Sequence, residues 1–590
     1  MFTNEKEMTM KQINLLIICL LGLMIGSCNK FMDRDPLAKI SPDNFFKTEK
    51  DLRLYVNSMY TMVPDAEGIY NEDMDNVVKS STSEFLTGKR QVPVTGGGWT
   101  WTELRKINYF LVNCNKVLPY STTRKYVGAA KFFRAWFYFE MVKKFGDVPW
   151  YTTPLDVNDK ALLQKARDPR KLIMDSVMAD IDSAIVSLDG VKSNELVTKW
   201  TALALKARIG LFEGTFRKYH KEFNLPDENK FLQAAADAAA QLMAGGQYRI
   251  FTSSPNVAYR DLFATKNANP DEIILSRKYS AGLQLYHNAN YYTITASYGQ
   301  PGLEKSLVNS YLMKDGTRFT DQPGYDKMQF FQECQGRDPR LAQTIRTPGY
   351  TRIGNTNKLV PDFGAAVTGY QVIKYVTDES QDSYVKNDND MPVFRYAEVL
   401  LNYAEAKAEL GQLTQADLDQ TIKLVRNRVG MPGLDMAAAN ANPDPYEAAR
   451  YSNKNISGVL LEIRRERRIE LLMENFRWND ICRWKEGTML TRQFKGMYFP
   501  GTGSFDLDND GKVDIVIYEG TKPTGPKGPA YLKLGSEIDL ENGTSGGAIV
   551  VNRNIGKTFN ETRDYLYPVP IQERTLNRNL TQNPNWNDGL

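Results

Sequence analysis

Long runs with helical periodicity constrain the fold of this chain more than any other feature. Residues 126–145 read YVGAAKFFRAWFYFEMVKKF, which is apolar round most of a helix, and Gly146 and Pro149 follow. Glycine after the last turn, with proline shortly beyond it, is typical of a helix end. A helix that is apolar on every side belongs in a protein interior. The sequence therefore predicts a mainly α-helical core.

Other helical runs come in pairs. Lys199–Gly214 is followed by Phe231–Met243, and Phe394–Gly411 is followed by Gln415–Val429. The second pair has about the 34-residue size of a tetratricopeptide helix hairpin, and stacked hairpins of this kind bury one continuous core. The pattern predicts a helical-repeat scaffold.

Long irregular segments interrupt these helices. Residues 247–380 and 499–559 are rich in Tyr, Asn, Gly and Pro, with short strand-like runs at 272–275, 370–375 and 513–520. Ordered loops on a rigid frame are common places for binding surfaces. We therefore expect few short strands, and we expect ligand contacts on the loops.

The N-terminus has the form of an export signal. Ile13–Ile25 is apolar, follows Lys11, and runs into Gly26-Ser27-Cys28, an aliphatic residue and two small ones before a cysteine. This pattern predicts that residues 1–27 are a signal peptide that is removed, and that the Cys28 thiol accepts a lipid anchor. The alternative is a chance cysteine at the end of a plain signal peptide.

Composition excludes several classes of function. The formal net charge is +4, from 74 basic and 70 acidic residues, which gives no basis for nucleic-acid binding. The two histidines, His220 and His287, lie in no zinc-ligand spacing and make a Ser-His-Asp triad improbable. Of the cysteines beyond Cys28, only Cys114, Cys334 and Cys482 remain, too scattered for a disulfide framework.

Seven segments in order resemble the SusD/RagB family of outer-membrane lipoproteins of Bacteroidota. They are CNKFMDRDP after the signal, RAWFYFEMVKKFGDVPW at 134–150, GRDPRLAQTI at 336–345, TGYQVIKY at 368–375, FRYAEVLLNYAEAKAELG at 394–411, IRRERRIELLMENFRWNDICRWK at 463–485 and YLYPVPIQERTLNRNLTQNPNW at 565–586.

The resemblance implies a function as well as a fold. It implies a mostly α-helical unit over residues 28–590, with an N-terminal part at 28–246 and a C-terminal part at 247–590. It also implies a lipid-anchored protein exposed at the cell surface, which binds glycan, or peptide in fewer members. Such a protein delivers its ligand to a SusC-like TonB-dependent β-barrel transporter in the outer membrane and is not an enzyme.

Aromatic residues in polar loops are the candidates for ligand contact. Sugars offer C–H faces that stack on rings, and hydroxyls that need polar partners. Two groups of residues meet these needs. The alternative to ligand contact, for each residue, is packing against loop backbone or against the barrel partner. The candidates are Trp99, Trp101, Arg105 and Asn108 in and after TGGGWTWTEL, and Tyr286, Tyr291 and Tyr292 in LQLYHNANYYT.

The most charged stretch, residues 460–484, carries Glu466, Glu470 and Glu474 at four-residue spacing. Such a spacing could pair carboxylates for glycoside hydrolysis, which makes a secreted glycosidase the alternative of another class. Interleaved arginines lower the pKa of carboxyl groups, whereas a general acid needs a raised pKa. We therefore expect a structural ion-pair helix.

The stretch FDLDNDGKVDI contains a partial calcium-loop pattern. Asp506, Asp508, Asp510 and Asp514 match the first, third, fifth and ninth positions, and Gly511 matches the sixth. The twelfth position is Ile517, where a bidentate glutamate is usual. Calcium is therefore a possible ligand and no cofactor is required, the alternative being a turn closed by hydrogen bonds.

Overall fold

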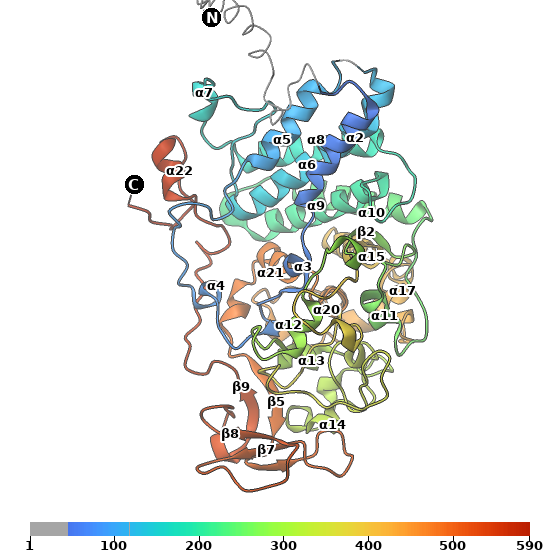
Figure 1. Ribbon diagram of the computed structural model, residues 1–590, viewed down its shortest axis with the longest axis vertical. Helices are drawn as coiled ribbons and strands as arrows, with labels where there is room; N and C mark the ends of the chain where they lie inside the picture. Colours follow the sequence, from blue (N-terminus) through green and yellow to red (C-terminus); the bar gives the residue numbers. More distant parts are fainter. Residues whose placement is uncertain (1–44, 117, 590) are drawn as a thin grey trace, which may run out of the picture.

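The computed structural model describes residues 45–116 and 118–589, and Figure 1 shows a helical upper part and a lower part dominated by loops. The helices of eight or more residues in these ranges are α2 (Glu49–Asn57), α5 (Thr102–Asn113), α6 (Tyr120–Phe145), α8 (Arg170–Ser187), α9 (Lys199–Tyr219), α10 (Glu228–Ala244), α15 (Tyr396–Glu409), α20 (Gly458–Glu470) and α21 (Arg477–Trp484). The shorter α-helices are α3 (Ala66–Tyr70), α4 (Glu84–Thr87), α7 (Lys160–Leu163), α11 (Ala258–Ala264), α12 (Ala289–Ile294), α13 (Lys305–Ser310), α14 (Phe330–Glu333), α16 (Gln415–Asp419), α17 (Ile422–Asn427), α18 (Met436–Ala441), α19 (Pro445–Arg450) and α22 (Ile571–Leu576).

The strands are short and form four small sheets within the described residues. They are β1 (Val77–Val78), β2 (Ile273–Arg277), β3 (Gly302–Leu303), β4 (Met391–Arg395), β5 (Lys495–Phe499), β6 (Gly503–Phe505), β7 (Ile515–Tyr518), β8 (Ala530–Lys533) and β9 (Gly547–Val550). The pairs β1–β3, β2–β4 and β5–β9 are antiparallel two-stranded sheets. The fourth sheet has the strand order β6–β7–β8, with β6 and β7 antiparallel and β7 and β8 parallel.

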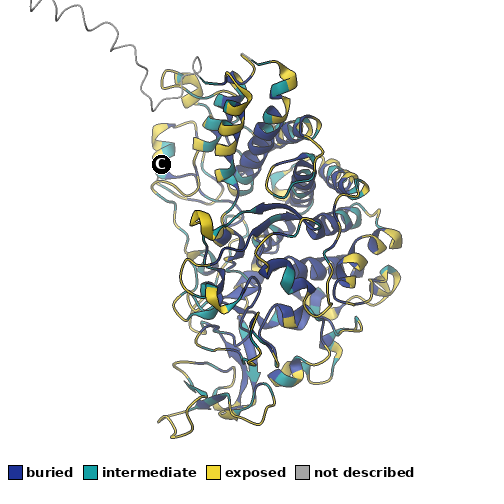
Figure 2. Cartoon of the chain, turned by 45° about the vertical axis from the view of Figure 1, so that its right-hand side comes forward, coloured by how far each residue is buried: buried dark blue, intermediate teal, exposed yellow. Residues whose placement is uncertain are grey.

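The expected mainly helical fold is confirmed, and α6 lies at its centre. This helix ends at Phe145 with Gly146 at φ +69°, as the sequence predicts. It buries Phe132, Phe133 and Phe137 on different sides, and it packs against α8. Figure 2 shows the buried interior of the helical layer, with exposed residues concentrated on outer turns and loops.

Close helix crossings explain the small residues of the predicted hairpins. α9 packs against α10, and a Cβ on Gly210 would lie 2.6 Å from the backbone oxygen of Phe231. A Cβ on Gly214 would lie 2.7 Å from the Leu232 side chain. Because real Cβ atoms do not approach so closely, glycine at these two positions sets the distance between the helices.

Some elements differ from their sequence patterns. The predicted helix over 415–429 divides into α16 and α17, because Thr421 leaves helical geometry and its hydroxyl donates to the backbone oxygen of Asp417 at 2.5 Å. The charged run at 460–484 divides into α20 and α21, with Met473 and Asn475 at positive φ between them. Residues 370–375 form only isolated bridges.

Hydrophobic clusters join distant parts of the chain. The cluster around α6 also contains Leu275, Phe394 and Leu400, so side chains beyond residue 246 complete it. The division at 246/247 stays a prediction. No helix in the described part of the chain is long and apolar enough to cross a membrane. Cys28 and the predicted signal peptide lie outside the described residues.

Candidate ligand-binding site

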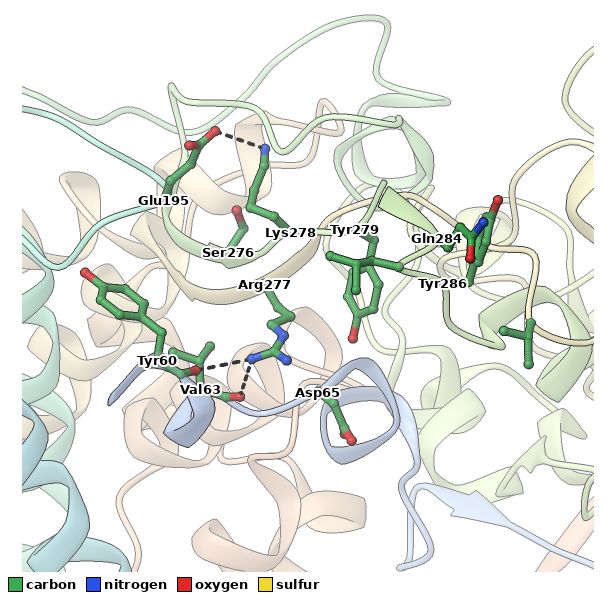
Figure 3. A pocket seen from close by; sticks show the side chains of 12 residues that line it. Tyr60, Val63, Asp65, Glu195, Ser276, Arg277, Lys278, Tyr279, Gln284 and Tyr286 are labelled. Carbon is green, nitrogen blue, oxygen red and sulfur yellow. Dashed lines mark hydrogen bonds and ion pairs between the residues drawn. The ribbon is translucent and has the colours of Figure 1, made fainter. Parts of the chain in front are cut away.

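A cavity of about 510 Å³ opens where the end of β2 meets the turn before α3 and two long loops (Figure 3). We call the surface formed by residues 279–298 and 382–387 around this cavity the loop face. Sequence positions that are far apart contribute to the cavity wall. The lining residues are Tyr60, Val63, Asp65, Glu195, Ser276, Arg277, Lys278, Tyr279, Gln284, Leu285, Tyr286 and Val385.

Charged side chains of both signs line this cavity. The Arg277 guanidinium donates to the backbone oxygens of Tyr60 at 3.2 Å and Val63 at 3.3 Å, as the dashed lines in Figure 3 show. Lys278 forms ion pairs with Asp390 at 2.5 Å and with Glu195 at 3.4 Å. The cavity therefore offers donors and acceptors with fixed positions, which suits a ligand with several hydroxyl groups.

Aromatic and apolar side chains are accessible on the loop face, and Leu285 among them lines the cavity. Tyr384 is 60% exposed, and Leu285 is 50% exposed. The ring of Tyr291 lies 5.4 Å from that of Tyr384 and 5.9 Å from that of Tyr298, centroid to centroid. Exposed ring faces beside a polar cavity provide a stacking surface for the C–H faces of sugars.

The loop face consists of two loops, and hydrogen bonds between these loops hold them in place. His287 and Asn387 exchange backbone hydrogen bonds of 2.9 and 3.1 Å, and the amide of Asn290 donates to Asp382 at 2.9 Å. The His287 ring is buried and lies 2.9 Å from the backbone oxygen of Asn389. Burial lowers the pKa of His287 to about 4, so the ring is neutral at pH 7.

The predicted tyrosines separate into two groups. Tyr286 lines the cavity, and the half-buried ring of Tyr291 contacts the exposed ring of Tyr384 on the loop face. Tyr292 is only 1% exposed and packs against Tyr70 in the core. The expectation that Tyr292 contacts ligand is therefore wrong, because its ring faces the interior.

The residues around Trp101 form a separate, shallower hollow of about 300 Å³. Trp101, Arg105 and Asn108 line it together with Tyr151, as their helical spacing would bring them together. Trp99 is instead 5% exposed and packs between Trp101 and Phe145. Trp99 is therefore a core residue, which corrects its prediction as a ligand contact.

Asn108 lies at the bottom of that hollow and is already used by the fold. Its amide nitrogen donates to the backbone oxygens of Tyr151 and Thr153, and its oxygen accepts from Arg134. The side chain is 1% exposed. These hydrogen bonds give Asn108 a role in positioning the Tyr151 segment, and direct contact between Asn108 and a ligand stays a prediction.

Several residues of the loop face were not predicted from the sequence. Tyr298 and Tyr384 lie in the polar segments ITASYGQPG and DSYVKND, so the criterion that selected Tyr286 could have selected them. Arg277, Lys278 and Tyr279 follow a buried strand, and nothing in their local sequence signals that they reach a cavity.

The paired glutamates of the charged stretch are buried in a network of ion pairs. Glu470 accepts from Arg428 at 2.6 Å and Arg395 at 2.7 Å, and Glu466 accepts from Arg426 at 2.8 Å. Burial alone would raise the pKa of Glu470, but the surrounding guanidinium groups outweigh burial and hold it well below its usual range. A carboxyl group in this state does not donate a proton to a glycosidic oxygen.

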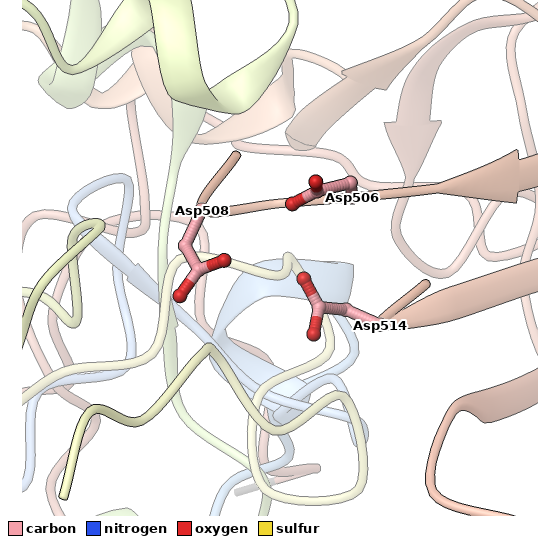
Figure 4. A group of neighbouring side chains, drawn as sticks. All are labelled: Asp506, Asp508 and Asp514. Atoms are coloured by element: carbon pink, nitrogen blue, oxygen red, sulfur yellow. The ribbon is translucent and has the colours of Figure 1, made fainter. Parts of the chain in front are cut away.

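Three of the four predicted calcium ligands lie together (Figure 4). One oxygen from each of Asp506, Asp508 and Asp514 lies within 4.8 Å of the others, whereas Asp510 pairs with Lys512 at 2.7 Å. Burial and the neighbouring carboxylates of Asp508 and Asp506 raise the pKa of Asp514. Asp506 also accepts from the backbone nitrogen of Gly511 at 2.7 Å. Calcium binding stays a prediction.

Comparison with known sequences identifies relatives over most of the chain. The SusD-like protein P38 of Formosa agariphila is 24% identical over 526 residues, covering 82% of this chain and 94% of that protein. The SusD-like protein P2 of the same organism is 22% identical over 509 residues, covering 81% and 92%.

Comparison with solved structures shows the same fold. A SusD-like protein from Bacteroides fragilis matches with a TM-score of 0.67 at 22% identity, covering 93% of this chain and 99% of that one. A SusD-like carbohydrate-binding protein from the same organism matches with a TM-score of 0.66 at 22% identity, covering 91% and 100%. The model of the SusD family matches residues 271–586, more than half of the 590 residues, so the chain belongs to the SusD family.

Proposed function

We propose that this protein binds glycan at the loop face and delivers it to a SusC-like TonB-dependent transporter in the outer membrane. The observation that carries the proposal is a cavity lined by Tyr286 and by fixed polar groups, next to a loop on which the rings of Tyr291 and Tyr384 contact each other. Membership of the SusD family supports the proposal, and so does the description of one structural relative as carbohydrate-binding.

Binding, without covalent chemistry, accounts for the groups on the loop face. Of the two carboxylates in the cavity wall, Asp65 accepts from the backbone nitrogen of Gly68 at 2.7 Å and begins α3. Glu195 pairs with Lys278. Asp65 and Glu195 therefore both interact with groups of the protein that hold the loops, and the glutamates of α20 form ion pairs in the core.

A glycan array tests the ligand class. We expect the purified protein to retain particular glycans, and we expect Tyr286→Ala to weaken that retention at an unchanged melting temperature. A peptide library run in parallel provides the alternative ligand. Retention of peptides with no retained glycan would contradict the proposal.

The lipid anchor is tested separately. Because acylation requires the Cys28 thiol, Cys28→Ala should release the protein from the outer-membrane fraction, whereas Cys114→Ala should leave its distribution unchanged. Cell fractionation followed by immunoblotting measures this distribution. A Cys28→Ala protein that stays with outer membranes would overturn the anchor prediction.

A further inference from the structure

A second and larger cavity lies among α13, α19 and β5, in the lower half of the view in Figure 1. Its volume is about 630 Å³, and it shares no lining residue with the cavity of the loop face. This volume falls within the range of small-molecule sites, roughly 300–1,000 Å³. The residues that carry the inference are Asn309, Tyr325, Tyr446, Arg492 and Phe494.

Two polar groups in this cavity have unused hydrogen-bonding capacity. Asn309 is 7% exposed, and its Nδ2 donates to the Tyr446 hydroxyl at 3.2 Å. Its Oδ1 has no hydrogen-bond partner among the described residues. A buried acceptor without a partner is destabilising, and a hydrogen bond from a ligand hydroxyl at this position would remove that cost. The Tyr446 hydroxyl accepts from Asn309, so its own proton is free to be donated.

Two cations at the cavity have only uncharged partners. Arg492 donates to the backbone oxygens of Arg450 at 2.6 Å and Ala449 at 3.3 Å. Lys557 donates to the backbone oxygen of Arg492 and lies over the ring of Phe494. Within the described residues no carboxylate lies within ion-pair distance of either cation. Burial lowers the pKa of Lys557 to about 8, although the carboxylates of Glu304 and Asp75 act in the opposite direction, and burial together with Arg450 lowers the pKa of Arg492.

Two of the four acidic residues of the cavity wall form ion pairs. Asp75 pairs with Arg477 at 2.6 Å and Arg450 at 3.0 Å, and Glu541 pairs with Lys495 at 2.5 Å. Glu304 accepts from the backbone nitrogens of Ser306 and Lys495. Asp326 is exposed at the rim. Arg492 is therefore an exposed guanidinium in the cavity wall without an ion-pair partner among the described residues.

We propose that this cavity is a second carbohydrate site and that it takes an acidic sugar unit. The sugar carboxylate meets Arg492, with Lys557 adding positive charge behind it. Its hydroxyls meet the free acceptor of Asn309 and the free donor of Tyr446. The half-buried ring of Tyr325, 6.2 Å from that of Tyr446, provides an aromatic surface for the sugar face.

Saturation-transfer NMR with D-galacturonate as ligand tests this inference, with D-galactose as the neutral match and acetate as the bare carboxylate. We expect galacturonate to bind the wild type, and we expect Arg492→Gln to weaken the affinity for galacturonate about tenfold or more. Arg124→Gln is the matched control, because Arg124 is an exposed arginine that also donates to a backbone oxygen, that of Val186 at 2.6 Å. Melting temperatures check that each variant is folded.

A second pair of variants separates this site from the loop face. Asn309→Leu removes the free acceptor and should weaken the binding of galacturonate. Tyr384→Ala on the loop face should leave this binding unchanged. The inference is overturned if galactose or acetate binds as well as galacturonate, if Arg492→Gln binds normally, or if Tyr384→Ala abolishes galacturonate binding. Failure here leaves glycan binding at the loop face standing, because that claim depends on other residues.

Discussion

Helix α20 and the loop face use their polar side chains in opposite ways. All 13 residues of α20 are buried, and its charged groups pair with one another and with neighbouring helices. On the loop face, Tyr384 is 60% exposed, and in the adjoining cavity wall Arg277 donates to the backbone oxygens of Tyr60 and Val63. The most charged stretch of the sequence therefore stabilises the fold, and the proposed binding surface lies where aromatic and polar groups remain accessible.

The largest expected effect comes from breaking the buried network. Glu470→Gln removes a charge shared by Arg395, Arg428 and Arg340, and we expect it to lower the free energy of unfolding by about 3–5 kcal/mol. Urea unfolding measures this change. The matched exposed pair is Asp175 with Lys171, where Asp175→Asn should cost about 1 kcal/mol or less. Equal costs for the two variants would remove the distinction between the regions.

Two tyrosines of one loop region sharpen the comparison further. Tyr292→Ala should lower the free energy of unfolding by about 3 kcal/mol, because it leaves a cavity beside Tyr70. Tyr384→Ala removes an exposed ring and should change stability by about 0.5 kcal/mol or less. Thermal and urea unfolding measure both. A large loss in Tyr384→Ala would show that this ring supports the fold.

His287 links the stability of the loop face to pH. Its pKa is about 4 in the folded protein against 6.5 ordinarily, so the unfolded state binds more protons between these values. Stability should therefore rise with pH across this window, and about 2 kcal/mol should be lost between about pH 7 and pH 5. His287→Gln should lose less over the same range. Identical pH profiles of unfolding would contradict this role.

The smallest expected effect concerns the acidic loop. If calcium binds Asp506, Asp508 and Asp514, a tenfold excess over its dissociation constant should stabilise the protein by about 1.4 kcal/mol. Differential scanning calorimetry with calcium and with chelator measures the change. Asp508→Asn should reduce it, and Asp326→Asn serves as the exposed control. A melting temperature that chelator does not affect would argue for a turn closed by hydrogen bonds alone.

Local sequence predicts the helices of this protein better than it predicts its site. The pattern at 126–145 contains its own signals, an apolar run and a terminal glycine, and α6 ends at the predicted residue. The ion-pair role of the glutamates in α20 also followed from sequence, because the arginines that interleave with them lower their pKa. Their complete burial did not follow, since Arg340, Arg395 and Arg428 come from other segments.

Which aromatic ring faces solvent is decided by partners far away in the sequence. Trp99 and Trp101 share one loop, yet Phe145 covers Trp99 and leaves Trp101 half-buried. Tyr291 and Tyr292 are neighbours, yet only Tyr292 meets Tyr70. Adjacent residues with the same local context cannot be separated by that context, so the sequence identified the loop but not its exposed rings.

Calorimetric titration of a glycan selected on the array most directly tests the claim that the loop face binds it. We expect Tyr384→Ala to raise the dissociation constant about tenfold at an unchanged melting temperature. Tyr120→Ala, which removes a ring of similar exposure (57%) from α6, should leave it unchanged. Wild-type affinity in Tyr384→Ala and Tyr286→Ala alike would contradict the account.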